Sequence, residues 1–479
     1  MKIKQTLKVL PLLAVMQVGF AETAAERLEQ GIQFQVSEEN LSAAVAEYEA
    51  VLKAAAKSHK LIAEARYRLA ECYLGLGQTK AMETQISALR EEFPRDNRWV
   101  IKAEKLSPAP WEFEGAPWVN GRLHTYGVKI PNGDTIGHFL IANRISKKAS
   151  EEVWESIAIR TAGGRSLSNV TFSQKDYKSL SARWFMDLFG DVSVTFKKDG
   201  KVLLIDSETG EQKDEYDHSK SRDAQIPMFE NEQAIQMLRV LKQEVGTQQK
   251  TMIYAAHNGG MQIPFDLEVT EHVDITVPAG TFSCAKIETS IKQTFYVSRG
   301  ERRELVRIDM GAAKIDLLKS EGWDVSQDQK LQSREFGATL RLPGNMFFLP
   351  PVDNQEVYRL EVWSSDFAGT WGMLELNKKA NLLPEGQKGS RELAELLHKG
   401  YAKNYEEFKV LDGWDELEID GVKAVGMRVT GKKGELNDHG YQVHAVGDEL
   451  SLTFRLHYAK PDEERAIARA KEIVKTIRW

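Results

Sequence analysis

The sequence predicts a multidomain protein of α plus β structure, with α-α hairpin repeats first, an antiparallel β-domain in the middle and an α+β sandwich at the end. The chain has 479 residues, which corresponds to roughly three domains of ~150 residues each. Apolar residues recur at three- and four-residue spacing up to about residue 105 and alternate with polar residues beyond it, which indicates helices followed by strands. The last part of the sequence combines alternating segments with two amphipathic helical segments.

The first segment, residues 1–21, has the three-part pattern of a secretory signal peptide. Lysines precede an apolar run that extends to Phe20, and Gly19 and Ala21 are the small residues expected before a cleavage site. The run is shorter than the about 20 residues that cross a bilayer. No Cys lies directly after it, so we expect no lipid anchor. We expect cleavage after Ala21, no transmembrane segment afterwards, and export to the periplasm or the medium.

Charge excludes two classes of partner. The net charge is −6, and removal of the leader with Lys2, Lys4 and Lys8 brings it near −9. Nucleic-acid-binding domains are usually basic, and a hold on anionic lipid needs clusters of Lys and Arg. We therefore expect neither nucleic acid nor an anionic membrane surface as the partner.

The chain contains two cysteines, Cys72 and Cys284. An oxidising compartment makes a disulfide conceivable, but the two residues fall in different predicted domains and have apolar or aromatic neighbours. Two buried free thiols are the favoured interpretation. Two cysteines at this spacing cannot form a structural zinc site.

Residues 22–105 are predicted to form two helical hairpins, the second of which breaks at Gly75-Leu76-Gly77 and ends at Phe93-Pro94. This hairpin resembles a tetratricopeptide repeat. The resemblance places five residues at the positions where the two helices of a repeat contact each other or end: Leu69, Ala70, Tyr73, Gly77 and Pro94. The earlier hairpin, residues 25–55, is similar through Ala44, Tyr48 and Val51, although Gly31 occupies a position where Leu is usual. Two repeats bury little core by themselves.

Residues 106–330 are predicted to form the antiparallel β-domain, joined to the helices by a linker at Ser107–Trp111. One helix, residues 232–241, interrupts the strands. The expected strands have alternating or β-branched sequences bounded by turn signals, and they are 157–160, 193–197, 202–205, 267–270, 285–289, 293–297 and 305–308.

The most specific string in this domain is a turn between two strands. Pro278 fixes φ and Gly280 permits positive φ, so the turn is chemically specified. The string Pro278, Ala279, Gly280, Thr281 and Phe282 resembles the VPAGTF signature of bacterial envelope β-domains of unknown function, and the opening at residues 110–115 is similar to the start of that family. The resemblance implies a half-barrel sheet like that of periplasmic lipoprotein carriers.

Residues 336–479 are predicted to be an α+β sandwich. Strands are expected at 356–362, 374–376, 421–429, 441–446 and 449–456, and helices at 390–402 and 461–477. The last strand and helix resemble the carboxyl-terminal half of a PsbP/Mog1-type sandwich, which implies a binding module. The segment 346–351 and Trp363, Trp371 and Trp414 are expected to be core, with an exposed partner-binding patch as the alternative.

Motifs for chemistry are missing from the sequence: it has no phosphate loop, G-x-S-x-G elbow, H-E-x-x-H or paired C-x-x-C. Glu271, His272 and Asp274 lie close together, and His272 and Asp274 share a face of the expected strand, but a third ligand at fixed spacing on that face is missing. Asp438, His439 and His444 form a second group, whose histidines fall on opposite faces of a strand. The charged run 211–223 is expected to be a solvated loop. We therefore predict no catalytic residues, no metal and no cofactor.

These observations favour a non-enzymatic, exported binding or scaffold protein of the bacterial cell envelope that contacts an unidentified protein through its helical repeats. A carrier that holds a lipid, a lipoprotein or another hydrophobic ligand in the half-barrel is one alternative and requires a continuous apolar cavity. An envelope hydrolase is another and requires a buried His–acid pair beside a Ser or Cys.

Overall fold

The computed structural model describes residues 23–37, 40–55, 58–94, 97–104, 106, 115–148, 150–186, 190–221, 224, 226–366, 370–378, 389–433 and 436–479. The chain divides into two compact units, residues 1–108 and 109–479. The predicted leader and the linker at 107–111 lie outside the described residues. The predicted class, multidomain α plus β, is confirmed: the first unit is helical and the second is built on two large sheets. Among the described residues, no helix has the length and apolar character to span a membrane.

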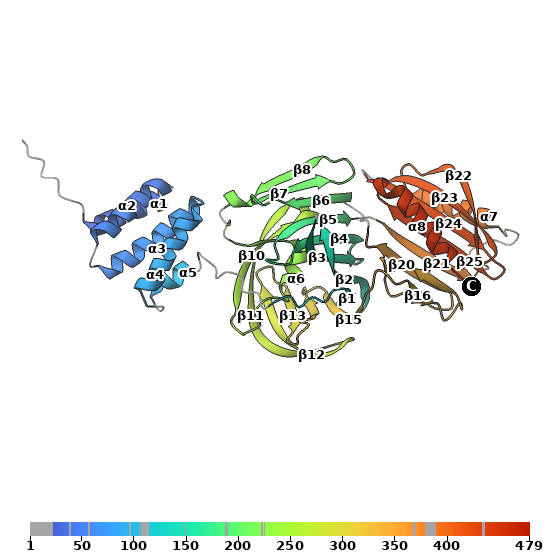
Figure 1. Ribbon diagram of the computed structural model, residues 1–479, viewed down its shortest axis with the longest axis horizontal. Helices are drawn as coiled ribbons and strands as arrows, with labels where there is room; N and C mark the ends of the chain where they lie inside the picture. The colour runs from blue at the N-terminus through green and yellow to red at the C-terminus, as the bar shows by residue number, and fades with distance from the viewer. Residues whose placement is uncertain are drawn as a thin grey trace, which may run out of the picture. The chain divides into compact units, whose positions relative to one another are not determined.

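The first unit consists of antiparallel helices packed around one apolar core (Figure 1). They are α1 (Ala24–Val36), α2 (Leu41–Ala54), α3 (His59–Gly75), α4 (Thr79–Glu92) and the short α5 (Arg98–Glu104), which the sequence analysis did not predict. A capping box between Thr23 and Glu26 begins α1, since each side chain bonds the other's backbone N–H. Gly77, in the turn between α3 and α4, has the left-handed φ of +70°.

Close packing of α1 against α2 explains why residue 31 is a glycine. A Cβ atom there would lie 2.5 Å from Cε1 of Tyr48, whose ring is fully buried. The aromatic ring of α2 therefore occupies the volume that a larger residue of α1 would fill.

The second unit begins with a 15-stranded antiparallel sheet in which only β9 is parallel to its neighbour. The strand order is β8-β7-β6-β5-β4-β3-β2-β1-β15-β14-β13-β12-β11-β10-β9, so the sheet has two free edges. The strands are β1 (Arg122–Lys129), β2 (Thr135–Lys148), β3 (Glu151–Arg160), β4 (Ser166–Ser173), β5 (Ser179–Met186), β6 (Gly190–Phe196), β7 (Lys201–Asp206), β8 (Gln212–Asp217), β9 (Met228–Glu230), β10 (Gln248–Ala255), β11 (Met261–Val277), β12 (Gly280–Thr289), β13 (Thr294–Ser298), β14 (Leu305–Asp309) and β15 (Lys314–Gly322).

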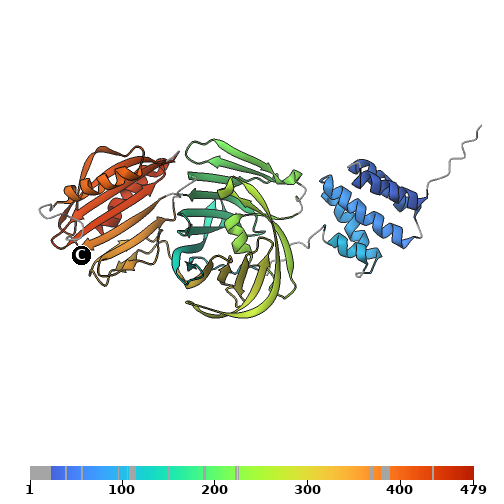
Figure 2. The same cartoon turned by 180° about the vertical axis from the view of Figure 1, so that it is seen from behind.

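The sheet curves around α6 (Asn231–Met237), which lies on its concave side (Figures 1 and 2). Two short 3-10 helices, η1 (His218–Lys220) and η2 (Ala256–Asn258), follow β8 and β10. Residues of α6 and of the segment after it share one core with the inner side chains of the strands. The predicted helix 232–241 is thus shorter than expected, because residues 238–241 leave the helix while remaining buried.

The carboxyl-terminal part has a second antiparallel sheet of order β18-β20-β21-β25-β24-β23-β22, with β19 beside β20 and a separate β16–β17 pair. Its strands are β16 (Gln329–Gln332), β17 (Thr339–Leu342), β18 (Met346–Phe348), β19 (Val352–Asp353), β20 (Val357–Ser364), β21 (Trp371–Lys378), β22 (Lys409–Ile419), β23 (Val422–Lys433), β24 (Leu436–Val446) and β25 (Leu450–Tyr458); its helices are α7 (Ser390–Tyr401), η4 (Ala402–Asn404), η5 (Lys460–Asp462) and α8 (Glu463–Lys475).

The two long helices of this part pack on opposite faces of the sheet. Residues of α8 share a core with Tyr441 and Val443, whereas His398 of α7 lies against His444. Successive side chains of a strand point to opposite faces, so α7 and α8 sandwich the sheet between them.

One sequence-based expectation needs correction here, and another, the core role of the segment 346–351, is borne out by its buried Phe347. The charged run 211–223 is not simply a loop: it contains the edge strand β8, whose Glu215 pairs with Lys201 of β7 at 2.8 Å. Charged side chains on an edge strand hinder pairing with another chain. The segment 346–351 includes β18, and its Phe347 packs with Trp363 in a cluster that joins the two sheets.

We call this group of residues the intersheet cluster. It comprises Leu123, Leu140, Ala142, Ile157, Ile159 and Leu167 from the first sheet together with Trp323, Phe347, Leu349 and Trp363. Trp363 is fully buried there, while Trp371 and Trp414 are half-buried. The predicted core role therefore holds for Trp363, in a core shared between two sheets.

Candidate functional site

The inner segment from Glu230 to Gln243 is the most unusual part of the second unit. It carries both apolar and ionisable side chains on the concave side of the sheet, and Glu230, Glu232, Gln236 and Arg239 are all at most 3 % exposed. Buried polar groups are costly unless they are hydrogen-bonded. The partners of these groups therefore define how the segment is held.

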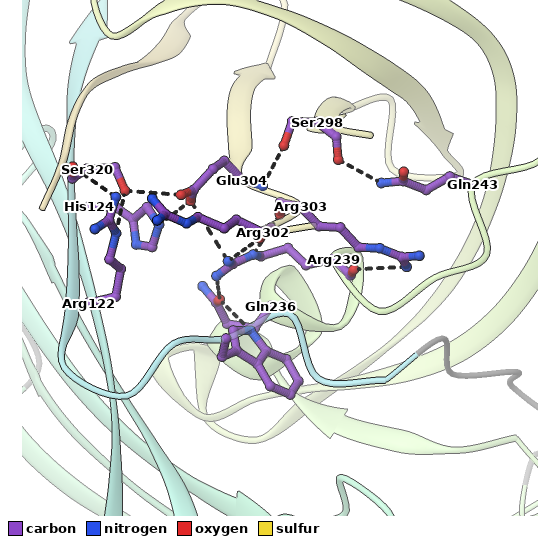
Figure 3. Close-up of polar contacts among 11 residues, drawn as sticks. Arg122, His124, Gln236, Arg239, Gln243, Ser298, Arg302, Arg303, Glu304 and Ser320 are labelled. Carbon is purple, nitrogen blue, oxygen red and sulfur yellow. Dashed lines mark hydrogen bonds and ion pairs between the residues drawn. The ribbon is translucent and has the colours of Figure 1, made fainter. Parts of the chain in front are cut away.

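Arg239 lies at the centre of the network drawn in Figure 3. Its guanidinium donates to the carbonyl oxygens of Arg302 and Arg303 at 2.9 and 2.8 Å and to Oε1 of Gln236 at 3.1 Å. Glu304 Oε2 lies 3.9 Å from it. The planar fork of an arginine suits several fixed acceptors at once, so one side chain fastens the loop between β13 and β14 to the inner segment.

His124 of β1 and Glu304, the residue before β14, complete this network. Nε2 of His124 contacts Oε2 of Glu304, and Ser320 Oγ donates to the other carboxylate oxygen at 3.2 Å. Burial lowers the pKa of His124, outweighing its bond to Glu304. Burial alone would raise the pKa of Glu304, but the bond from His124 and the charge of Arg239 hold it at about 2. A neutral imidazole therefore donates from Nε2 to an ionised carboxylate.

A second network holds the start of the same segment. The indole Nε1 of Trp184 donates to Oε1 of Glu230 at 2.7 Å, and Ser179 Oγ donates to Gln233 Oε1 at 2.5 Å. Arg160 pairs with Glu232. Complete burial, followed by the charge of Glu232, raises the pKa of Glu230 to about 8, so this carboxyl group is protonated at neutral pH.

The first unit has a different kind of site, a groove of about 480 Å³ between the start of α3 and the start of α5. We call it the α3–α5 groove, and it is lined by His59, Lys60, Ala63, Phe93, Asn97, Arg98 and Trp99. Ala63, Phe93 and Trp99 are buried and form an apolar floor, whereas His59, Lys60 and Arg98 are exposed.

Positive charge is concentrated around Trp99 of this groove. The side chains of Arg98, Lys102 and Arg68 lie 4.5, 4.8 and 5.9 Å from the centre of its ring. Cations within about 6 Å of an indole face are attracted by its quadrupole. Of these three cations, Arg98 lines the groove, and Oε2 of Glu64 lies 3.9 Å from its Nη2. The groove therefore offers apolar contact area beside the exposed Lys60 and Arg98.

The predicted repeat-packing residues lie where two of the helices meet. Leu69 and Ala70 are fully buried, and the hydroxyl of Tyr73 donates to Glu49 of α2 at 2.8 Å. Pro94 is exposed directly after α4 and the buried Phe93. Leu69, Ala70 and Tyr73 therefore pack between helices, whereas Gly77 and Pro94 are exposed. None of the five predicted positions lines the groove, although Phe93, the neighbour of Pro94, does.

The predicted signature turn joins β11 to β12. Val277 lies opposite Gly280, so Pro278 and Ala279 form a two-residue loop, and Gly280 has φ +134°. Thr281 Oγ1 lies 3.0 Å from Thr276 Oγ1, while the ring of Phe282 packs against the inner core. The string serves as a hairpin connection between β11 and β12.

Neither candidate metal group is assembled as a ligand set. Nε2 of His272 contacts the carbonyl oxygen of Gln243 at 2.7 Å, and Glu271 pairs with Lys286. Asp438 binds Tyr405 and His457, and burial lowers the pKa of His444 to about 3. In the described part of the chain, no three His, Cys, Asp or Glu side chains could hold a metal ion.

Cys72 and Cys284 are buried free thiols, as expected, and burial raises the pKa of each to about 12.

The hydrolase alternative requires a buried His–acid pair such as His124–Glu304, but the nearby serine, Ser320, contacts the carboxylate of this pair instead of the imidazole. Ser320 Oγ contacts the carboxylate of Glu304, whereas Nδ1 of His124 has no hydrogen-bond partner. A nucleophilic serine must instead contact the imidazole that takes its proton. The described residues around this pair therefore form no nucleophile–base contact.

Sequence reasoning missed His124, Arg239 and Glu304. Their sequence separation hides the network, because β1 meets the β13–β14 loop only through long-range strand pairing. One signal was available: Glu232, Gln236 and Arg239 recur at helical spacing among apolar residues, which marks polar groups on a buried segment.

No protein-family model and no curated protein matches this chain. Several solved structures are similar to parts of it, among them PsbP, MucB and TplEi. Cyanobacterial PsbP from Synechocystis sp. PCC 6803 is 9 % identical, with 33 % of this chain and 95 % of that one covered and a TM-score of 0.26. MucB is 7 % identical over 76 % of this chain and 94 % of its own, with a TM-score of 0.18. The immunity protein TplEi of Pseudomonas aeruginosa is 10 % identical over 58 % and 94 %, with a TM-score of 0.20.

Proposed function

We propose that this chain is a non-enzymatic, exported binding protein of the bacterial cell envelope, and that its α3–α5 groove holds an acidic segment of a partner protein. The observation that carries the proposal is the groove itself, with the buried floor of Phe93 and Trp99 beneath exposed Lys60 and Arg98. An apolar anchor beside carboxylates of the partner would match this surface, because charge complementarity guides both encounter and register.

The concave side of the large sheet supports a binding role over lipid transport. Ala234, Met237, Leu238 and Leu241 belong to the inner core, and Arg239 joins that segment to the loop between β13 and β14. An acyl chain would have to displace this segment and leave buried ionic groups without partners, at about 1–3 kcal/mol or more for each group. The geometry of His124, Glu304 and Ser320 supports the absence of hydrolase chemistry in the same way.

The groove can be tested with defined peptides. We would measure fluorescence anisotropy of labelled decapeptide pools of equal aromatic content, carrying net negative, zero or positive charge, with the mature full-length protein. The negative pool should bind best, and its affinity should fall as salt screens the charges. The double variant Lys60→Glu/Arg98→Glu should lose this preference.

A matched control is Lys80→Glu, which reverses one exposed lysine on α4 outside the groove and should bind as the wild type does. Equal binding of all three pools, or unchanged binding by the double variant, would rule out the acidic segment. Export is tested separately: the mature protein from an envelope fraction should begin at Glu22, as its intact mass would show.

A further inference from the structure

Four polar side chains on the inner face of the large sheet carry buried atoms that have no hydrogen-bond partner. They are His124 of β1, Asn143 of β2, Ser156 of β3 and Ser168 of β4, and each is 1 % exposed. The unpaired atoms are Nδ1 of His124, both Nδ2 and Oδ1 of Asn143, and the hydroxyl oxygens of the two serines.

The strand register places these side chains next to one another. Asn143 of β2 lies directly opposite Ser156 of β3. On β1, the residue opposite Asn143 is Arg122, so His124, two residues later, is a diagonal neighbour of Asn143. Ser168 is two residues before Val170, the residue opposite Ser156. Opposite side chains of an antiparallel pair are about 5 Å apart and diagonal ones about 7–8 Å. We call these four residues the inner polar track.

The track faces the concave side, where α6 lies. Ile141, Ala158 and Val170, which alternate with the track residues along their strands, belong to the inner core, whereas Ala142, Ile157 and Leu167 belong to the intersheet cluster. α6 contacts β3 and β4 directly. The track residues therefore lie on the face of the sheet that α6 covers.

The grouping of these atoms is the informative point. An unsatisfied buried polar group destabilises the fold, and buried polar atoms in native proteins are rarely left unpaired. Five such atoms on one continuous track indicate a common partner. The neighbouring ionic groups do not need one, since Glu304 and Arg239 are held by each other and by the main chain, and Arg122 donates to Ser320.

We propose that the inner polar track binds a small uncharged molecule that carries hydroxyl or amide groups, enclosed between β1–β4 and α6. The amide of Asn143 both donates and accepts, and each serine hydroxyl can do either. Nδ1 of His124 accepts, because Nε2 carries the proton that bonds Glu304. We expect the ligand to be uncharged, because every ionic side chain of the neighbouring network already has a partner in the protein and none is left to pair with a charged ligand. This site is independent of the α3–α5 groove and of the peptide that the groove is proposed to bind.

Native mass spectrometry of the full-length protein, purified from cells without refolding, tests the site. The expected spectrum contains a species heavier than the polypeptide by a discrete mass, which disappears on denaturation and is recovered as a small molecule in the extract. Asn143→Leu should lower the bound fraction at least tenfold. Ser146→Ala, on the same strand but on the opposite face, should keep the wild-type fraction.

The melting temperature of Asn143→Leu gives an independent result. If the track holds a ligand, the substitution removes its central contacts and lowers the melting temperature. If the track holds none, the substitution replaces two unpaired buried atoms by apolar ones and raises it. Ser156→Ala, which removes a single atom, serves in the same two assays if Asn143→Leu does not fold.

Three outcomes would overturn the proposal: a native mass equal to that of the polypeptide, a melting temperature of Asn143→Leu above that of the wild type, or a crystal structure with ordered water only along the track. Failure of the groove experiment leaves these measurements unaffected, so the two proposals fail or stand separately.

Discussion

Arg239 and Arg303 each hold the main chain that carries the other. Arg239 Nε donates to the carbonyl oxygen of Arg303 at 2.8 Å, and Arg303 Nη1 donates to those of Leu241 and Arg239 at 3.0 and 3.4 Å. Arg303 has φ +43°, in the left-handed region. A non-glycine residue persists in that region only where its surroundings determine it, and the reciprocal bonds of the two arginines supply such surroundings.

Replacing Arg239 should destabilise the second unit strongly. Arg239→Met removes three hydrogen bonds and leaves the ionised carboxylate of Glu304 without its nearby charge. We expect a loss of about 3–5 kcal/mol in the free energy of unfolding, measured by urea denaturation. Arg302→Met is the control, because the side chain of Arg302 is exposed and only its carbonyl oxygen is used; its effect should stay within about 0.5 kcal/mol. Equal losses in the two variants would remove the structural role assigned to Arg239.

The protonated Glu230 should make the protein less stable as the pH rises. Its pKa is about 8 in the folded state against an ordinary value of 4.5, so between these values the unfolded chain releases a proton that the folded chain retains. The free energy of unfolding therefore falls from about pH 4.5 to pH 8, by an amount on the order of a few kcal/mol. Glu230→Gln should flatten this slope, whereas Glu268→Gln at an exposed position should not. A slope that is identical in the wild type and Glu230→Gln would show that another group governs it.

Acid should loosen the sheet beneath α7. Burial, followed by the charges of His398 and Arg455, lowers the pKa of His444 from 6.5 to about 3. Stability contributed by the neutral imidazole is present above pH 6.5 and is lost as the pH falls from there towards 3, because the unfolded chain gains the proton first. Hydrogen exchange of β24 and β25 amides should accelerate at pH 4.5 in the wild type and much less in His444→Gln. His439→Gln, a half-buried position on the same strand, should retain the acceleration.

The intersheet cluster should couple the unfolding of the two sheets. Trp363 is fully buried, and its Nε1 donates to Oε1 of Glu361, which Arg165 of the first sheet also contacts. Truncating a buried Trp to Ala costs about 3–5 kcal/mol. Trp363→Ala should therefore split one calorimetric unfolding transition into two. Val352→Ala, at an exposed position, should leave a single transition, and a split in both variants would contradict the coupling.

Local patterns predicted the elements better than the sites. The helices of the first unit and the hairpin at Pro278–Gly280 follow from spacing and turn chemistry within short stretches. The edge strand β8 was not recognised, because its charged sequence lacks the alternation that marks a half-buried strand. The networks of Arg239 and of Glu230 could not be predicted, since each depends on strands that are distant in sequence. The inner polar track is of the same kind: Asn143 and Ser156 become neighbours only once the register of β2 and β3 is known.

The pairing of β1 with β15 has a consequence for how this protein is made. Arg122 lies opposite Gly322, 200 positions later, and this pair sits in the middle of the strand order. Closing so long a loop costs conformational entropy before any stabilising contact forms. Topologies rich in pairings between distant residues therefore fold slowly. While the ribosome is still synthesising residues before β15, β1 can pair only with β2, and the large sheet cannot be completed. A chain whose folding is delayed in this way stays unfolded for longer after synthesis, and its apolar strands remain exposed until β15 pairs with β1.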